Sequence, residues 1–267
     1  MYYPGLEGKN ALLIGGNSNI GQYVSLLLAE SGANIVIACR DTKRGNEIAE
    51  EARAFGKGEA VVVKTDCSDW EAIENAVSRV HEFGAIDILY HGVGGDWPGH
   101  FLDLDPELWD KLYQLNFKNI LMAYKIVLPI MKQQRSGCFI TMSSVMGRIP
   151  TPMEPIYGAL KCGLIYLAQT LALDLGPYGV RINVVAPGPT PPKDPDRLSE
   201  GSLLKTLIEN KELVENLTAE ILPQIPLGKL GDPEACAHAV LYLASPVTGG
   251  YQTGQVIGVD GGWWMPK

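Results

Sequence analysis

Short apolar runs alternate with longer stretches of helical periodicity along the whole chain. The apolar runs are rich in Val, Ile and Leu. Most are continuous rather than alternating, which is typical of strands buried on both faces of a parallel sheet. They predict strands at residues 11–15, 34–39, 60–65, 86–91, 138–143, 181–186 and 255–260.

The segments between these runs have the spacing of amphipathic helices, as at residues 20–31, 43–55 and 70–83. Asp69 and Asp232 are predicted N-caps, and Gly32 and Gly84 are predicted helix ends. Strand and helix alternate without a linker or repeat. The pattern therefore predicts one α/β domain over residues 1–267, with a doubly wound parallel sheet of about seven strands and helices on both faces.

One segment breaks the alternation, because residues 187–201 are too rich in proline for a helix or a strand. A helical stretch rich in Leu follows it. In an open α/β sheet, a long excursion after the carboxyl end of a strand lies on the side where ligands bind. We therefore predict a mobile substrate lid at residues 188–226, with a surface or subunit-contact helix as the alternative.

Composition excludes several classes of function. The 267 residues suffice to bury roughly three-quarters of the surface that the unfolded chain exposes. A net charge of -8, with scattered Lys and Arg, argues against nucleic-acid binding. The N-terminus shows no signal-peptide pattern. The apolar segment 156–175 carries Lys161 and Asp174, so we expect a buried helix there rather than a membrane span. These features predict a cytoplasmic protein without a membrane partner.

The cysteines are odd in number and widely spaced, with no C-x-x-C motif. They predict reduced core thiols rather than disulfides, and no metal site is expected. The five are Cys39, Cys67, Cys138, Cys162 and Cys236.

The stretch "IGGNSNIG", residues 14–21, joins the first predicted strand to the first helix. Backbone N–H groups and the helix dipole bind a pyrophosphate at such a turn. The G-x-G-x-x-G pattern is not matched, and asparagine is the least costly replacement for glycine where φ is positive. The loop alone leaves a cofactor site and an ordinary turn open. Its candidate cofactor contacts are Gly15, Asn17, Ser18, Asn19, Ile20 and Gly21.

The end of the second strand bears on which cofactor would bind. An acidic residue there accepts hydrogen bonds from the ribose hydroxyls of NAD. This chain has Arg40, whose guanidinium favours a 2′-phosphate, followed by Asp41, which would pair with it. A solvated surface arginine is the alternative.

Tyr157 and Lys161 lie four residues apart in a helical segment, so they share one face. Lys161 is the only charged residue between Ile156 and Leu173. A buried lysine is costly unless it is paired, and snorkelling to solvent is the alternative. An ammonium near the phenol lowers its pKa by roughly 1–3 units, toward the range of general acid–base catalysis.

These residues resemble those of the classical short-chain dehydrogenases/reductases, over about 250 residues. Ser144 stands thirteen residues before Tyr157, the spacing of the family's Ser and Y-x-x-x-K elements. Asn116 in "YQLNFKN" matches the asparagine of the family's catalytic tetrad. The resemblance implies a single-domain Rossmann-type fold and assigns catalysis to Asn116, Ser144, Tyr157 and Lys161.

The resemblance also assigns further cofactor contacts, although two family motifs are altered. Ile14 and Asn19 replace the threonine and middle glycine of T-G-x-x-x-G-I-G, and "HGVG" at residues 91–94 replaces N-N-A-G. We expect His91 to be a satisfied structural histidine, with a hydrogen bond near the cofactor as the alternative. The further contacts are Asp66 on the adenine, Cys67, Gly92, and, near the nicotinamide, Pro187, Gly188 and Thr190.

The implied activity is hydride transfer between a nicotinamide cofactor, NADP(H) preferred and NAD(H) possible, and a carbonyl or secondary alcohol. Ser144 would polarise the substrate oxygen, Tyr157 would act as general acid or base, and Lys161 would lower the tyrosine pKa and hold the ribose. The family role of Asn116 is to anchor a water. An enoyl or dienoyl thioester reductase of the same fold and a non-catalytic nucleotide sensor are the alternatives. The resemblance also implies a homotetramer.

The substrate pocket is expected to be bordered by Asp96, Trp97, residues 146–153 and residues 187–217. Apolar members of this set suggest an alicyclic or steroid-like substrate, unless they serve only packing. Two further aromatic residues near the C-terminus are predicted either in the core or at a neighbouring subunit. They are Trp263 and Trp264.

Overall fold

The computed structural model describes residues 3–195, 198, 205 and 208–265. Seven parallel strands form one sheet in the order β3-β2-β1-β4-β5-β6-β7. The strands are β1 (Asn10–Ile14), β2 (Asn34–Cys39), β3 (Ala60–Lys64), β4 (Ile88–His91), β5 (Gly137–Met142), β6 (Val180–Pro187) and β7 (Val256–Val259).

All seven predicted strands are confirmed, and their ends agree with the prediction to within two residues. The largest difference at a strand start is in β4, which begins at Ile88 rather than at residue 86. Asp87 explains it, because its carboxylate accepts hydrogen bonds from the Asn10 backbone N–H at 3.0 Å and from Lys9 Nζ at 2.8 Å. The Asp87 side chain thus adds to the backbone hydrogen bonds that Asp87 makes with Asn10 and Cys138.

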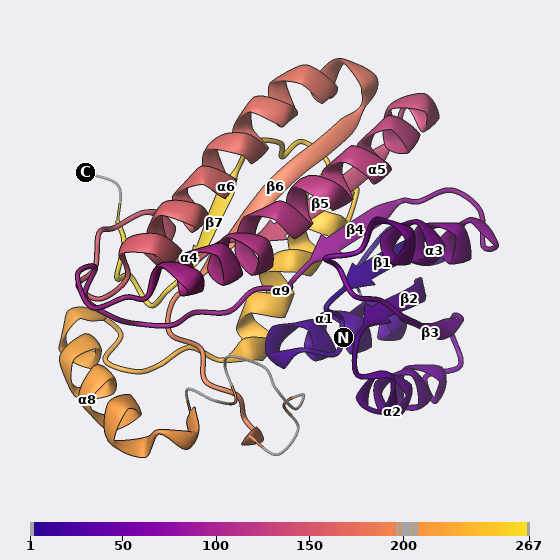
Figure 1. The fold of residues 1–267 in the computed structure, drawn as a ribbon. Helices are drawn as coiled ribbons and strands as arrows, with labels where there is room; N and C mark the ends of the chain where they lie inside the picture. The colour runs from indigo at the N-terminus through magenta and orange to yellow at the C-terminus, as the bar shows by residue number, and fades with distance from the viewer. Residues whose placement is uncertain (1–2, 196–197, 199–204, 206–207, 266–267) are drawn as a thin grey trace.

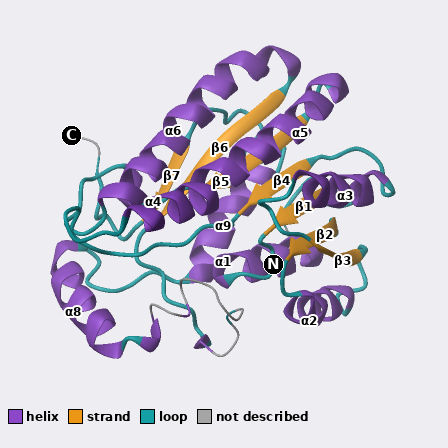
Figure 2. Cartoon of the chain, viewed as in Figure 1, coloured by secondary structure: helices purple, strands orange, loops and turns teal. Residues whose placement is uncertain are grey.

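Helices cover both faces of the sheet (Figure 1, Figure 2). One apolar cluster joins the sheet to α1, α2 and α9, and the other joins it to α3, α5 and α6. Alternate residues of β1 divide between them, with Leu13 in the first and Leu12 in the second. The bounds are α1 (Asn19–Glu30), α2 (Thr42–Arg53), α3 (Trp70–His81), α5 (Asn119–Gln134), α6 (Pro155–Leu175) and α9 (Pro233–Ala244).

The predicted helix caps are confirmed. Asp69 accepts a hydrogen bond from the Glu71 N–H at 3.0 Å, and Asp232 accepts one from the Glu234 N–H at 2.8 Å. Such a cap stabilises a helix by about 1 kcal/mol. Gly32 and Gly84 have φ of 88° and 128°, which suits the turns that follow α1 and α3.

Helix α6 is buried along one face only, so the prediction of a buried helix is wrong for its outer face. Lys161 and Leu164 face inward, whereas Tyr166 and Leu173 are 74% and 80% exposed. Cys162 is also exposed, unlike the other four cysteines, and all five are free thiols. By length and composition, residues Pro155–Tyr178 are apolar enough to cross a membrane, and 22% of their apolar window is buried within the protein.

Part of the predicted lid lies outside the described residues, namely 196–197, 199–204 and 206–207. The described part contains helix α8 (Lys211–Ile221), which has no buried residue, and the short helix η5 (Leu222–Gln224). Its role as a lid stays a prediction.

Candidate active site

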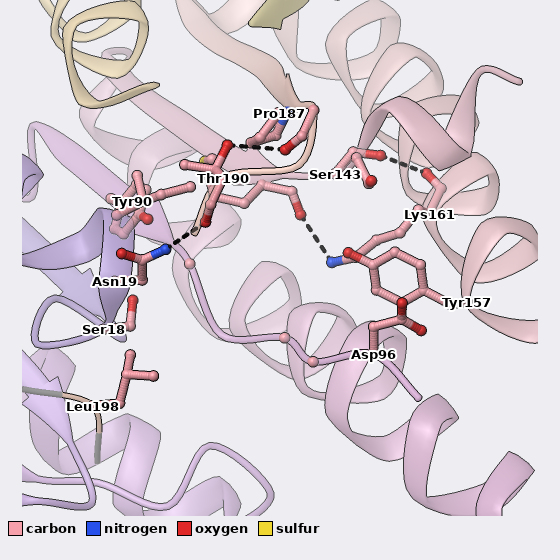
Figure 3. A pocket seen from close by; sticks show the side chains of 17 residues that line it. Ser18, Asn19, Tyr90, Asp96, Ser143, Tyr157, Lys161, Pro187, Thr190 and Leu198 are labelled. Carbon is pink, nitrogen blue, oxygen red and sulfur yellow. Dashed lines mark hydrogen bonds between the residues drawn. The ribbon is translucent and has the colours of Figure 1, made fainter. Parts of the chain in front are cut away.

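A cavity of about 270 Å³ opens at the carboxyl end of the sheet, where β1, β4, β5 and β6 end. Figure 3 shows Asn19 and Thr190 on one side of it and Tyr157, Lys161 and Asp96 on the other. The predicted residues that line it are Ser18, Asn19, Ile20, Gly92, Asp96, Ser144, Tyr157, Lys161, Pro187, Gly188 and Thr190.

Tyr157 and Lys161 lie one turn apart on the inner face of α6. Lys161 is 3% exposed, and its Nζ donates a hydrogen bond to the Met142 carbonyl at 3.2 Å. The same Nζ lies 5.4 Å from the centroid of the Tyr157 ring. Ser143 Oγ donates to the Lys161 carbonyl at 2.8 Å, which fixes α6 against the end of β5. Lys161 therefore does not snorkel to solvent.

Ser144 follows β5 and turns the chain away from the sheet. Its Oγ accepts a hydrogen bond from the Met146 N–H at 3.2 Å and so caps the short helix Val145–Gly147. The side chain is 8% exposed and lines the cavity beside Tyr157.

Asn116 lies in a π-helical segment, Gln114–Lys118, between α4 (Pro106–Tyr113) and α5. Its amide donates to the Gly95 carbonyl at 2.7 Å and accepts from the Gly95 N–H at 3.1 Å. A Cβ on Gly94 would meet Asn116 Oδ1 at 2.9 Å and Lys161 Nζ at 3.0 Å. The structure thus brings the four predicted catalytic residues to one place. Such π-bulges occur frequently at functional sites.

The electrostatics of Tyr157 differ from the prediction. Burial and the charges of Asp96 and Glu154 raise the tyrosine pKa, and a hydrogen bond with Ser144 lowers it less. The expected lowering by Lys161 is therefore wrong for this structure. Burial lowers the pKa of Lys161 itself to about 8, against the opposing influence of Asp96. Burial is the largest influence on both pKa values, because each side chain is shielded from solvent.

Two carboxyl groups meet beside the tyrosine. Asp96 follows β4 and Glu154 directly precedes α6, and their side chains share a hydrogen bond. Burial, followed by the Asp96 charge, raises the pKa of Glu154 to about 10. Burial also raises the pKa of Asp96. Sequence reasoning found Asp96 but missed Glu154, which has no motif of its own.

The glycine loop has the shape that a pyrophosphate requires. Gly15 has φ of 80°, and a Cβ on Gly21 would lie 2.0 Å from the Gly15 carbonyl oxygen, so glycine is required at both positions. Asn19 is 8% exposed, and its Oδ1 is buried without a partner in the described protein. An unpaired acceptor beside a helix N-terminus, over an open cradle, fits a polar cofactor.

Other predicted cofactor residues lie outside the cavity. Arg40 is exposed after β2, and Asp41 caps α2 by accepting from the Arg44 N–H at 3.1 Å instead of pairing with Arg40. Asp66 is exposed and accepts from Ser68. Asn17 and Cys67 are buried, with the Asn17 amide donating to the Asp41 carbonyl at 3.2 Å.

His91 is not the satisfied structural histidine that the sequence predicts. It is fully buried at the end of β4, and neither ring nitrogen has a hydrogen-bond partner among the described residues. Burial, with a smaller effect of Lys161, lowers its pKa to about 3. The ring is therefore neutral at physiological pH.

Among the described residues, the expected substrate-pocket segments contribute unequally to the cavity. Asp96 lines it, whereas Trp97 and residues 146–153 do not. The 187–217 segment contributes Leu198 to the cavity lining, besides the predicted nicotinamide contacts Pro187, Gly188 and Thr190. Trp264, which the sequence predicts either in the core or at a neighbouring subunit, stacks on Arg148 of the same chain. The Arg148 guanidinium carbon lies 4.1 Å from the centroid of the Trp264 ring.

Comparisons with known proteins find relatives over nearly the whole chain. A family model described as enoyl-(acyl carrier protein) reductase matches residues 14–264. The 3-oxoacyl-(acyl-carrier-protein) reductase FabG of Thermotoga maritima is 33% identical over 259 residues, which cover 96% of this chain and 98% of that protein. The 2,5-dichloro-2,5-cyclohexadiene-1,4-diol dehydrogenase LinX of Sphingobium indicum is 31% identical over 263 residues, with 97% of each chain covered.

The chain belongs to the short-chain dehydrogenase/reductase family. A structure of 7α-hydroxysteroid dehydrogenase, complexed with NADH and 7-oxo glycochenodeoxycholic acid, matches with a TM-score of 0.83 at 25% identity over 98% of both chains. A short-chain type dehydrogenase/reductase from Mycobacterium marinum matches with a TM-score of 0.82 at 27% identity, over 98% of this chain and 97% of that one. The protein is a nicotinamide-dependent oxidoreductase of this family with a Rossmann-type fold.

Two further buried polar residues of this short-chain dehydrogenase/reductase escaped sequence reasoning. Ser143 lines the cavity and anchors Lys161. Arg44 does not line the cavity; it is 7% exposed and donates to Gln22 Oε1 at 2.7 Å, which ties α2 to α1. In the sequence, the only signal for Ser143 is its position beside Ser144. Arg44 gave no signal, because the sequence pattern of its helix predicts an amphipathic helix with its charged residues in solvent.

Proposed function

We propose that the protein transfers a hydride between a nicotinamide cofactor, preferably NADP(H), and a carbonyl or secondary alcohol. The observation that carries this proposal is that Ser144, Tyr157 and Lys161 line one cavity that extends to the glycine loop. Figure 3 shows Tyr157 and Lys161 across the cavity from Asn19, which belongs to the loop that would hold the pyrophosphate, and this supports Tyr157 as the proton donor.

Each residue then has a distinct role. The Ser144 hydroxyl donates a hydrogen bond to the substrate oxygen, and the Tyr157 phenol donates its proton to that oxygen during reduction. The raised pKa of Tyr157 keeps the phenol protonated, which suits this direction. Lys161 holds the cofactor ribose, and Asn116 fixes the Gly95 backbone beside Lys161. The bound nicotinamide supplies or accepts the hydride.

The remaining predicted contacts belong to the cofactor in this proposal. Arg40 would bind a 2′-phosphate, since its exposed guanidinium stands at the end of β2 and Asp41 is engaged as a helix cap. Asp66 and Cys67 would flank the adenine. Gly92 and Gly188 would allow close approach of the cofactor to the strand ends.

A second candidate is reduction of an enoyl thioester, favoured by the description of the matching family model. The Ser144 and Tyr157 pair suits carbonyl chemistry better, because both hydroxyls converge on one cavity where a carbonyl oxygen would lie. The non-catalytic nucleotide sensor is the less supported alternative, because such a protein has no need of a buried lysine beside a tyrosine.

A nucleotide titration tests the proposal first. The purified protein is titrated with NADPH and then with NADH, with quenching of tryptophan fluorescence as the signal. We expect tighter binding of NADPH, followed by NADPH oxidation with a panel of ketones and none with crotonyl-coenzyme A. Tighter NADH binding would reverse the cofactor preference. Turnover of the enoyl thioester alone would favour the second candidate, and binding of neither nucleotide would overturn the enzymatic proposal.

We also propose that the chain forms a homo-oligomer, a tetramer as in the family expectation, in the cytoplasm. The apolar outer face of α6, with Tyr166 and Leu173 exposed, supports a subunit contact there. Residues 188–226 keep the proposed role of a substrate lid.

A further inference from the structure

The proposed mechanism leaves one pair of half-buried carboxyl groups unused. Asp96 lines the reaction cavity together with Ser144 and Tyr157, and its Oδ1 accepts a hydrogen bond from the Trp97 N–H at 2.7 Å. Glu154 lies behind it and shares a hydrogen bond with it. The Oε2 atom of Glu154 is buried without a partner in the described part of the chain.

The two carboxyl groups hold one proton between them at neutral pH. Two adjacent negative charges in a poorly solvated site repel strongly, so one of the pair stays protonated. The shared hydrogen bond assigns the proton to Glu154, because that bond raises the pKa of Glu154 and lowers the pKa of Asp96. Its O–H then donates to Asp96, which carries the negative charge. Lys161 faces the same cavity and influences Asp96 with the opposite charge.

This charge arrangement determines which substituents a substrate can carry. The carboxylate of Asp96 and the ammonium of Lys161 line the cavity, and the neutral acid Glu154 adds no charge, so the three groups together have no net charge. An anionic substituent near the reacting carbon is repelled by the Asp96 carboxylate. A cationic substituent is repelled by the Lys161 ammonium, which already balances the charge of Asp96. A hydroxyl group is a neutral donor, and a carboxylate with free lone pairs accepts its hydrogen bond.

The position of Asp96 also limits where that hydroxyl lies. Asp96 lines the same cavity as the two hydroxyls that would receive the reacting oxygen, and its charge acts directly on the Tyr157 phenol. Figure 3 shows the Asp96 carboxyl beside the Tyr157 ring. A substituent one or two carbons from the reacting carbon would therefore face Asp96.

We propose that Asp96 is the specificity residue of this pocket, that it accepts a hydrogen bond from a second hydroxyl of the substrate, and that Glu154 positions it. The substrate class is then a neutral diol, or the corresponding hydroxy ketone in the reductive direction. This inference rests on the proposed function and goes beyond it, since the family activity does not require a second hydroxyl.

The first test compares four alcohols built on one ring. They are cyclohexanol, 1,2-cyclohexanediol, 2-aminocyclohexanol and 2-hydroxycyclohexanecarboxylate, each oxidised with the nucleotide that binds more tightly. We expect kcat/KM for the diol to exceed that of each other alcohol by at least about tenfold, the effect of one hydrogen bond to a charged group.

Three variants then identify the residues responsible. Asp96→Asn removes the charge, and we expect the ratio of diol to cyclohexanol activity to fall below about threefold. Glu154→Gln retains an N–H donor to Asp96 and should keep the ratio, whereas Glu154→Leu should lose it. The exposed Asp103→Asn is the matched control and should keep the wild-type ratio. If Asp96 had a purely structural role, Asp96→Asn would lower kcat/KM for the diol and for cyclohexanol alike and leave their ratio unchanged.

The outcomes separate this inference from the proposed function. Equal kcat/KM for diol and cyclohexanol, or a preference for the amino alcohol or the hydroxy acid, would overturn the inference and leave the oxidoreductase proposal standing. An unchanged ratio in Asp96→Asn would overturn the assignment of Asp96. Absence of oxidation of all four alcohols would overturn both.

Discussion

The side-chain amide of Asn19 donates a 2.8 Å hydrogen bond to the backbone carbonyl of Thr190. It joins the glycine loop to the segment after β6, although the two residues are 171 positions apart. A glycine at position 19, as in the family motif, has no side chain to make this link. The departure from the motif therefore adds a contact across the proposed cofactor site instead of destroying the site.

Asn19→Gly restores the family residue and removes this link. We expect nucleotide affinity to fall by about twofold to tenfold, because one hydrogen bond that pre-orders the site contributes about 0.5–1.5 kcal/mol. Fluorescence titration measures the change, and Gln133→Ala at an exposed position of α5 is the control. Unchanged affinity would show that the link has no part in binding.

Tyr157→Phe tests the acid–base assignment. Loss of the phenol should lower kcat by at least about 100-fold, while nucleotide affinity stays within about twofold of wild type. Steady-state kinetics and the same titration provide both values. Tyr251→Phe, at a fully exposed tyrosine, is the control. Retained turnover in Tyr157→Phe would contradict the mechanism.

Arg40→Asp tests the cofactor preference. A carboxylate at this position repels a 2′-phosphate and accepts ribose hydroxyls, so we expect the ratio of NADPH to NADH affinity to fall by at least about tenfold. Lys57→Asp makes the same charge change at another exposed position and should leave the ratio unchanged. A constant ratio in Arg40→Asp would refute the phosphate contact.

Glu154→Gln should change the pH dependence of stability. The Glu154 pKa is raised to about 10 in the folded protein, so the folded state holds a proton that the unfolded state releases above its ordinary value of 4.5. Wild type therefore loses stability as the pH rises from about 4.5 toward 10. The glutamine does not titrate.

The variant should consequently gain stability relative to wild type between pH 5 and pH 8, by about 1–3 kcal/mol after allowance for partial exposure. Urea unfolding at both pH values measures the difference, with the exposed Glu220→Gln as the matched substitution. A difference that falls as the pH rises would contradict a protonated Glu154.

Tyr166→Asp tests the proposed subunit contact on α6. A charge on this exposed apolar face should convert an oligomer to a smaller species, because an unpaired carboxylate is costly to bury. Light scattering measures the mass. Tyr251→Asp, at another exposed tyrosine, should leave the mass unchanged. A wild-type protein with the mass of one chain would exclude the homo-oligomer.

The sequence by itself determined the sheet and the two helical layers, and it indicated the proposed catalytic group. Continuous apolar runs specify strands buried on both faces. Tyr157 and Lys161 were singled out because they share one turn of a helix, and Ser144 because its spacing from them resembles that of the family. Such local patterns are encoded by neighbouring residues and need no knowledge of the rest of the chain.

Only the tertiary structure decided the electrostatics of the site. Whether Lys161 lowers the tyrosine pKa depends on what desolvates both groups and on the carboxyls of Asp96 and Glu154, which come from separate loops. The contact of Asn19 with Thr190 is likewise set by segments distant in sequence, as is the lack of a hydrogen-bond partner for the His91 ring within the described part of the chain. Solvation and charge act through space, so their balance is fixed only when the fold brings those segments together.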